Sequence, residues 1–143
     1  MRVCKGRRQP ATIGVLLVIL AAGAASRARH VSAFAQDAGG DAALKAALMR
    51  EGQDLYGQCS ECHSEGGVGP TLAGDKGLAN KDFVVKQILA GSSSGEMPKF
   101  APDFTDRQVA AVATYVRNAW DNAYGLVLED DAKRLRAALA DKK

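Results

Sequence analysis

Apolar residues recur along much of the chain three or four positions apart, which is the spacing of one face of a helix. The first such stretch begins at Asp41, which we expect to act as its N-cap. Its apolar face consists of Leu44, Leu48, Gly52, Leu55 and Tyr56. A second helix is predicted between Asn80 as N-cap and Gly91 as terminator. Its buried stripe consists of Val84, Val85, Ile88 and Leu89.

The third helix has the clearest pattern in the sequence. Thr105 and Gln108 form a capping box, in which each side chain bonds the backbone of the other residue. The apolar face that follows consists of Val109, Val112, Ala113, Val116, Ala119 and Trp120. A tail over residues 123–143 adds a short amphipathic helix, Asp130–Leu139. Its apolar positions are Ala132, Leu135, Ala138 and Leu139. No strand-like alternation is visible, so we expect an all-α fold.

Two segments between these helices are predicted to be loops. Ser64–Gly77 is rich in glycine and contains Pro70. It lacks the G-x-x-x-x-G-K-[ST] pattern, so we do not expect it to bind phosphate. Ser92–Gly95 is expected to be a mobile link, and it leads directly to Glu96-Met97-Pro98.

The N-terminus has the organisation of a secretory signal peptide. Four basic residues precede an uncharged apolar run, Ala11–Ala25, which is shorter than the about 20 residues of a transmembrane helix. Ala33-Phe34-Ala35 is an A-x-A cleavage motif. We therefore predict that residues 1–35 are removed and that the mature protein is periplasmic. An earlier cut after Ala25 and an uncleaved N-terminal anchor are the alternatives.

Removal of this segment reverses the sign of the net charge. The 143-residue chain has 19 Lys/Arg and 16 Asp/Glu, a formal net charge of +3. The first 35 residues hold six of the basic residues and no acidic one, which leaves 13 against 16, or −3. A mildly acidic chain of this kind gives no basis for nucleic-acid binding, which requires a basic face. The remaining length suits one small domain.

The strongest motif is Cys59-Ser60-Glu61-Cys62-His63, a single C-x-x-C-H of the kind that attaches c-type haem. In that role the two thiols add to the haem vinyl groups as thioethers. The two intervening residues let both sulfurs reach one edge of the macrocycle. The histidine after the second cysteine is then held under the iron as its proximal ligand. The motif therefore predicts one haem c, covalently bound through Cys59 and Cys62, with His63 on the iron.

Three other roles for Cys59 and Cys62 agree less well with the sequence. A thiol redox pair is expected near a βαβ pattern, which is not visible here. A zinc site needs four ligands, and the remaining Cys4 and His30 fall in the predicted leader. A structural disulfide leaves His63 unexplained. Haem attachment is the role that uses all three residues of the motif.

The sixth coordination position of the iron needs a second ligand. After the predicted leader the only histidine is His63, and the only methionines are Met49 and Met97. Met49 is on the helix just before the haem motif and is expected to be a packing residue. Met97 lies 34 residues after His63 in an irregular segment, so the chain has room to wrap around the haem. We therefore predict His63/Met97 ligation, with Lys99 as a weaker nitrogen donor at high pH.

These motifs, taken in order, resemble those of the bacterial class I cytochromes c. The shared pieces, besides the C-x-x-C-H, are Gly52-Gln53-Asp54-Leu55-Tyr56, Gly69-Pro70-Thr71-Leu72-Ala73-Gly74, Gly95-Glu96-Met97-Pro98 and Tyr115-Val116-Arg117-Asn118-Ala119-Trp120. They cover almost all of Asp41–Asn122. The resemblance implies the fold of that family, with three core helices wrapped around one haem and a short C-terminal helix added. The cytochrome domain is then expected over residues 36–122.

The resemblance also implies roles for single residues. Gly52 and Tyr56 are expected to cross the last core helix near Tyr115. The Pro70 carbonyl is expected to accept a hydrogen bond from the His63 ring and to fix its orientation. Three aromatic residues are expected to be core residues that help to enclose the haem and do not carry an electron: Tyr56, Tyr115 and Trp120.

The expected function is a one-electron carrier and not an enzyme. Thioether ligation favours ferrous iron, raises the reduction potential and blocks access of substrates to the iron. The Trp120 ending and the tail helix are similar to those of small cytochromes that serve periplasmic dehydrogenases. This implies redox protein partners: a dehydrogenase, a quinol-oxidising complex or a terminal oxidase. We expect a monomer with no nucleic-acid partner and no stable membrane insertion after cleavage.

Two alternatives to a free carrier remain. One is a cytochrome subunit of a larger oxidoreductase, in which the tail helix is an interaction element. The other is a haem sensor or enzyme with a labile distal ligand. The charges allow a further expectation: lysines around the exposed haem edge steer docking to an acidic partner, unless they are ordinary solvated residues. These lysines are Lys76, Lys81, Lys86 and Lys99.

Overall fold

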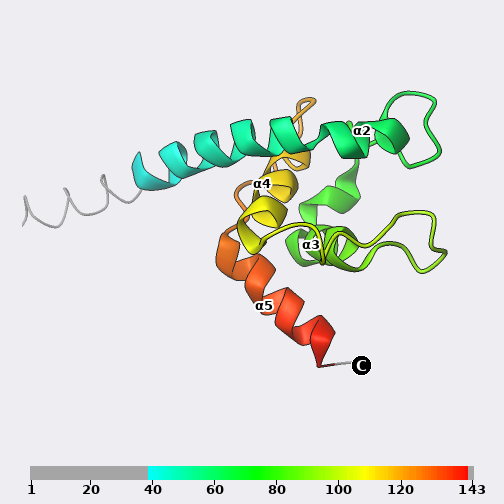
Figure 1. The fold of residues 1–143 in the computed structure, drawn as a ribbon. Helices are drawn as coiled ribbons and strands as arrows, with labels where there is room; N and C mark the ends of the chain where they lie inside the picture. Colours follow the sequence, from blue (N-terminus) through cyan, green and yellow to red (C-terminus); the bar gives the residue numbers. More distant parts are fainter. Residues whose placement is uncertain (1–38, 142–143) are drawn as a thin grey trace, which may run out of the picture. The chain divides into compact units, whose positions relative to one another are not determined.

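The computed structural model describes residues 39–141, and every regular element in this part of the chain is helical. Residues 39–55 are the first described helix. They are followed by α2 (Gly57–His63), the 3-10 helix η1 (Lys76–Ala79), α3 (Lys81–Ala90), α4 (Asp106–Val116) and α5 (Glu129–Ala140), as Figure 1 shows. The absence of strands from residues 39–141 confirms the all-α prediction.

Helix α4 lies in the core. The predicted capping box holds its start, since the Gln108 N–H donates to Thr105 Oγ1 (3.2 Å) and the Thr105 N–H donates to Gln108 Oε1 (2.9 Å). Seven of its eleven residues are buried, so most of the surface of α4 must be covered by other parts of the chain. Helices α3 and α5 both pack against it.

The first described helix crosses α4 at Gly52. A Cβ atom on Gly52 would overlap the Ala111 carbonyl and lie 2.7 Å from the Tyr115 Cβ. The absence of a side chain therefore allows the two backbones to touch, which confirms the crossing expected near Tyr115. It also explains a glycine in mid-helix, where glycine costs about 1 kcal/mol relative to alanine. Tyr56 packs beside the crossing, with its ring centroid 5.3 Å from that of Tyr115.

Two predicted helix ends differ from the observed ones. Asp41 lies inside the helix over residues 39–55 and does not cap it, because the residues before it are helical too and extending an existing helix costs little. Helix α4 ends at Val116, and Trp120 already has a positive φ of 52°. The Asn122 side chain donates to the Val116 carbonyl (3.0 Å), so a side-chain hydrogen bond replaces the next helical turn.

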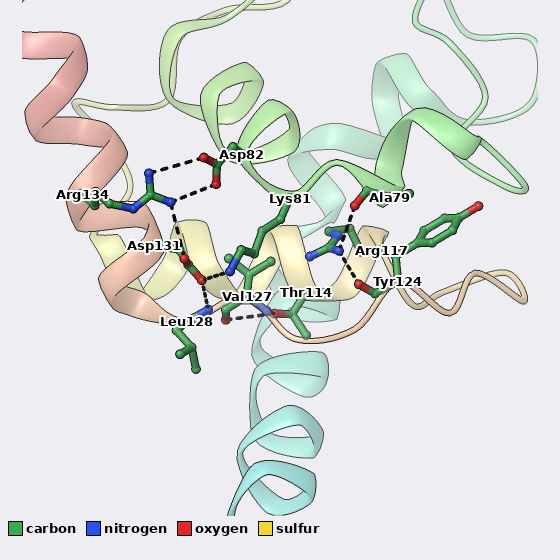
Figure 2. Close-up of polar contacts among 10 residues, drawn as sticks. All are labelled: Ala79, Lys81, Asp82, Thr114, Arg117, Tyr124, Val127, Leu128, Asp131 and Arg134. Atoms are coloured by element: carbon green, nitrogen blue, oxygen red, sulfur yellow. Dashed lines mark hydrogen bonds and ion pairs between the residues drawn. The ribbon is translucent and has the colours of Figure 1, made fainter.

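Helix α5 packs its apolar face against the core, as predicted for the tail. Ala132 and Leu135 are buried, and α5 contacts both α3 and α4. Figure 2 shows the two ion pairs that join α5 to the start of α3: Asp131 with Lys81 at 2.8 Å, and Arg134 with Asp82 at 2.9 Å. The tail helix is therefore an integral part of the folded unit.

The buried Arg117 ties the segment after α4 to η1. Its Nε donates to the Leu78 carbonyl (2.9 Å), and its Nη2 donates to the carbonyls of Ala79 (3.3 Å) and Tyr124 (Figure 2). Only 5% of the residue is exposed, so these bonds are shielded from water. They fix the position of Leu78, which lines the cavity described below.

The predicted signal peptide, residues 1–35, lies outside the described residues and stays a prediction. The domain limits at 36–122 and 123–143 are likewise predictions. Between residues 39 and 141, no helix has both the length and the apolar character needed to span a bilayer.

Candidate haem site

A cavity of about 370 Å³ is lined by α2, α3 and the loops that follow them. This volume falls within the about 300–1,000 Å³ of small-molecule and cofactor sites. Apolar side chains from the loops, η1, α3 and α4 also line it: Val68, Leu72, Leu78, Phe83, Val84, Ile88, Pro98, Phe100, Val112 and Val116. Cys59, Cys62 and His63 line it from α2, Pro70 from the next loop and Met97 from the loop after α3. The fold therefore brings all the predicted site residues to one cavity.

The C-x-x-C-H motif lies on α2. Positions three and four apart are neighbours on one face of a helix. Cys59, Cys62 and His63 have this spacing, so helix formation presents both thiols and the imidazole on the same wall of the cavity. A turn at Tyr56 separates α2 from the helix before it.

The Cys59 thiol does not have the lowered pKa that is typical of a redox-active cysteine pair. Burial and the neighbouring Cys62 raise the pKa of the Cys59 thiol, whereas reactive pairs have a lowered thiol pKa. A zinc site is not supported either. Within residues 39–141 there is no group of three or more His, Cys, Asp or Glu side chains that could hold a metal ion.

His63 is oriented by the loop that follows α2. Its Nδ1 donates a hydrogen bond to the Pro70 carbonyl oxygen at 2.8 Å, as the resemblance implied. The Gly69 N–H donates to the Cys62 carbonyl (2.9 Å), and a Cβ on Gly69 would lie 2.9 Å from Nδ1 and Cε1 of the His63 ring. Glycine therefore lets the loop pass against the imidazole. Because Nδ1 carries the proton, Nε2 keeps a lone pair for a metal.

Met97 is held in a hydrogen-bonded turn, and the mobility expected for Ser92–Gly95 stays a prediction. The Met97 N–H donates to Ser92 Oγ (3.0 Å), and the Ser92 N–H donates to the Met97 carbonyl (3.0 Å). The Gly95 N–H also donates to the Ser92 carbonyl (3.1 Å). The small polar residues of this loop therefore provide hydrogen-bond partners for the backbone of the turn. Figure 1 shows this loop, in yellow-green, apart from α2, so the cavity receives Met97 and the α2 residues from different segments.

Asn122 is a residue at this site that the sequence analysis missed. It is buried, and its side-chain amide bonds three backbone groups: the Gly74 N–H (3.1 Å) and the carbonyls of Leu72 and Val116 (both 3.0 Å). It thereby ties the loop containing Pro70 to the end of α4. No periodicity or motif marks this asparagine, because its loop partners are 48 and 50 positions away in the sequence.

The lysines expected around the haem edge do not line the cavity. Lys81 instead pairs with Asp131 because α5 packs against the start of α3. The charged residues of the lining are the carboxylates of Glu61, Asp75 and Glu96, and no Lys or Arg of the described chain is among them. The expectation of basic steering toward an acidic partner gains no support from this arrangement.

The aromatic residues expected to enclose the haem also lie elsewhere. Tyr56, Tyr115 and Trp120 form a cluster with ring centroids 5.2–5.6 Å apart. None of them lines the cavity, and Trp120 is 40% exposed. The reason is that Tyr115 is on the face of α4 that meets the first described helix. The cavity is lined by Val112 and Val116 of α4.

The donor set and the walls of this cavity fit a covalently attached haem. Two thiols and an imidazole with a free nitrogen share one helix, and a thioether sulfur lines the same cavity. Of the two methionines among residues 39–141, Met97 lines the cavity and Met49 does not. Most of the remaining lining is apolar, as a site that excludes water from a cofactor requires.

Comparison with known proteins identifies one family and several relatives. The family model described as cytochrome c oxidase, cbb3-type, subunit III matches residues 47–116. The fructose dehydrogenase cytochrome subunit of Gluconobacter japonicus is 34% identical over 107 residues, covering 61% of this chain but only 22% of that protein. Cytochrome c6 of Thermosynechococcus vestitus is 34% identical over 83 residues, covering 52% of this chain and 72% of that protein. Cytochrome c6 of Thermostichus vulcanus matches equally well. No solved structure matches the chain.

Proposed function

The chain belongs to the class I cytochromes c, with one haem c bound through Cys59 and Cys62, and from this premise we propose that it is a one-electron carrier with His63 and Met97 as axial ligands. The observation that carries the proposal is the shared cavity. His63 and Met97 both line it, and His63 is the only histidine among residues 39–141. The Pro70 carbonyl accepts a hydrogen bond from His63 Nδ1, which would leave the lone pair of Nε2 for the iron.

The protein and the haem have separate parts in this function. The bound haem supplies the one-electron ferric/ferrous couple. His63 and Met97 would leave no open position on the bound iron, so the coordination would be the same in the two oxidation states. Apolar side chains such as Leu72, Val84 and Val112 exclude water and lower the local dielectric, which favours the form with less charge. A site with no open position transfers electrons and does not bind substrates.

The proposed setting is the periplasm, with a dehydrogenase as the electron donor. The signal-like sequence of residues 1–35 supports export. The relative named as a cytochrome subunit of fructose dehydrogenase supports a dehydrogenase as partner, although the match spans only 22% of that protein. A quinol-oxidising complex or a terminal oxidase are the other partners consistent with a one-electron carrier.

The same relative makes a subunit of a larger oxidoreductase the second candidate function. In that case we would expect the tail helix to be available for a partner. In the structure Ala132 and Leu135 of α5 are buried against the chain's own α3 and α4. This favours the free carrier.

A titration of the full holoprotein, matured with haem in a periplasm, tests the proposal. Electrodes or redox dyes set the potential while the visible spectrum is recorded, and the native mass is measured in the same buffer. The proposal predicts a single one-electron wave, low-spin spectra in both oxidation states and a monomeric mass. High-spin ferrous haem would reject the closed His/Met site, and a stable complex with a dehydrogenase would favour the subunit.

A further inference from the structure

Arg136 of α5 makes three polar contacts, all to residues between the Met97 loop and the first turn of α4. Its Nε pairs with Asp106 Oδ1 at 2.6 Å. Its Nη2 donates to the Phe104 carbonyl at 2.6 Å, and its Nη1 donates to the Ala101 carbonyl. The side chain is 30% exposed, so these bonds are partly shielded from water. A single guanidinium thus connects α5, the start of α4 and the chain that leads from Met97.

The segment from Phe100 to Phe104 is bonded on its other side to α3. The Phe100 N–H donates to the Ile88 carbonyl (3.0 Å), and the Ala101 N–H donates to the Leu89 carbonyl (3.2 Å). The Phe100 ring stacks on that of Phe104, with centroids 5.2 Å apart, and Phe100 lines the haem cavity. The backbone is therefore clamped between the end of α3 and Arg136, beginning three residues after Met97.

We propose that Arg136 is a positioning residue for Met97, so that the C-terminal helix holds the distal ligand loop of the haem site in place. The inference rests on the proposed His63/Met97 ligation and adds to it the group that restrains the loop. Without Arg136, the segment after Met97 keeps its hydrogen bonds to α3 but loses those to α5. The sulfur then leaves the iron more often, and external ligands gain access.

Arginine is suited to this position because its planar fork offers several N–H donors in fixed directions. Three of them are used here at once. Lysine in the same place would keep the charge for Asp106, but a single ammonium on a flexible stem cannot hold both carbonyls in the same geometry.

Arg134 provides a matched control on the same helix. Like Arg136, it pairs with an aspartate in the first turn of a core helix, in this case Asp82 of α3 (2.9 Å; Figure 2). It has no hydrogen bond to the backbone of the Met97–Phe104 segment. A substitution of either arginine that simply weakens the packing of α5 would have the same effect at both positions. An effect on Met97 should appear only when Arg136 is replaced.

The experiment compares the full holoprotein with its Arg136→Gln, Arg134→Gln and Met97→Ala variants. Two ligation readouts are recorded: the rate of carbon monoxide binding to the ferrous form, and the pH at which the ferric form loses the long-wavelength band of thioether-ligated haem. We expect Arg136→Gln to bind carbon monoxide about tenfold faster than the wild type, because charged-donor hydrogen bonds are each worth about that factor. It should also lose the thioether band at lower pH. Arg134→Gln should match the wild type in both.

Equal behaviour of Arg136→Gln and Arg134→Gln, with the thioether band present in the wild type, would overturn the positioning role alone. If the wild type binds carbon monoxide as fast as Met97→Ala, the ligation and the positioning role are both rejected. Should Arg136→Gln yield no folded holoprotein, Arg136→Lys and Arg134→Lys form the replacement pair. Arg136→Lys must then bind carbon monoxide faster than the wild type, and Arg134→Lys must match the wild type.

Discussion

Asn122 donates a hydrogen bond to the carbonyl of Leu72, 50 positions earlier in the chain, at a distance of 3.0 Å. The same side chain bonds the Gly74 N–H and the Val116 carbonyl. One buried amide therefore holds the loop that contains Pro70 against the end of α4. Because Pro70 orients His63, the segment after the last core helix supports the proximal side of the haem site.

Replacement of Asn122 by alanine removes three hydrogen bonds and leaves the Gly74 N–H and the Val116 carbonyl without a partner, whereas the Leu72 carbonyl keeps the Asp75 N–H (3.4 Å). Each unsatisfied buried group costs about 1–3 kcal/mol. We expect Asn122→Ala to lower the free energy of unfolding of the holoprotein by about 3 kcal/mol, measured by chemical denaturation. The neighbouring Asp121→Asn is the control, because this exposed residue has a φ of 65° that asparagine also tolerates. Equal stability of the two variants would refute a supporting role for Asn122.

Gly52→Ala tests the crossing of the first described helix with α4. The added methyl group would meet the Ala111 carbonyl and the Tyr115 Cβ, and neither backbone can move without disturbing the core. We expect a loss of about 2 kcal/mol or more in the free energy of unfolding. Gly57→Ala is the matched control, since a Cβ at this position would have no other atom within 4 Å and alanine is the better helix former. It should be neutral or slightly stabilising.

Gly69→Ala tests the contact between the proximal loop and His63. The new Cβ would lie 2.9 Å from the imidazole and must displace the ring or the loop, which weakens the bond from Nδ1 to Pro70. A histidine without that bond is a poorer electron donor to iron, so the reduction potential should rise, by on the order of 50 mV. The control is Thr71→Ala, at an exposed position of the same loop that does not line the cavity. A potentiometric titration in which both variants equal the wild type would contradict this role of the loop.

Asp131 should make stability depend on pH. Burial by itself raises the pKa of this carboxyl, but hydrogen bonds from Lys81 and the Leu128 N–H, with the charges of Lys81 and Arg134, outweigh it and leave the pKa below the usual value. A lowered pKa in the folded state stabilises the protein above the unfolded pKa of about 4. This contribution is lost as the pH falls through the folded pKa.

We therefore expect Asp131→Asn to be less stable than the wild type at pH 7, by about 1 kcal/mol. Below about pH 4 the difference should begin to shrink, because the carboxyl is then protonated in the unfolded chain, and it should vanish once the pH has fallen through the lower folded pKa. Thermal unfolding of both holoproteins across this pH range measures the effect. The exposed neighbour Asp130→Asn is the control, and a difference that stays constant with pH would show that charge at Asp131 is not the cause.

The sequence predicted those parts of the structure that depend on local pattern. Helix α3 begins after Asn80 and ends at Gly91, and α4 begins with the Thr105 capping box, because caps and periodicity are properties of neighbouring residues. The tail helix was predicted from its apolar spacing, and Ala132 and Leu135 are buried as expected. The C-x-x-C-H motif is local in the same sense.

Contacts between distant segments were not predictable in this way. Asn122 and Arg136 donate hydrogen bonds to backbone carbonyls. Every residue has such a carbonyl, so the sequence does not indicate which ones these side chains will bind. The packing of Trp120 was not predictable from local pattern either. Helical spacing places it on the apolar face of α4 with Val112 and Val116, which line the cavity, whereas in the structure it packs against Tyr56 and Tyr115.

Binding of carbon monoxide to the ferrous holoprotein, compared between wild type, Met97→Ala and Met49→Ala, tests the central claim most directly. Met49 is the matched control, because it is the other methionine of the described chain and does not line the cavity. We expect that wild type and Met49→Ala resist the gas and that Met97→Ala binds it rapidly. Rapid binding by the wild type, or continued resistance in Met97→Ala, would contradict His63/Met97 ligation.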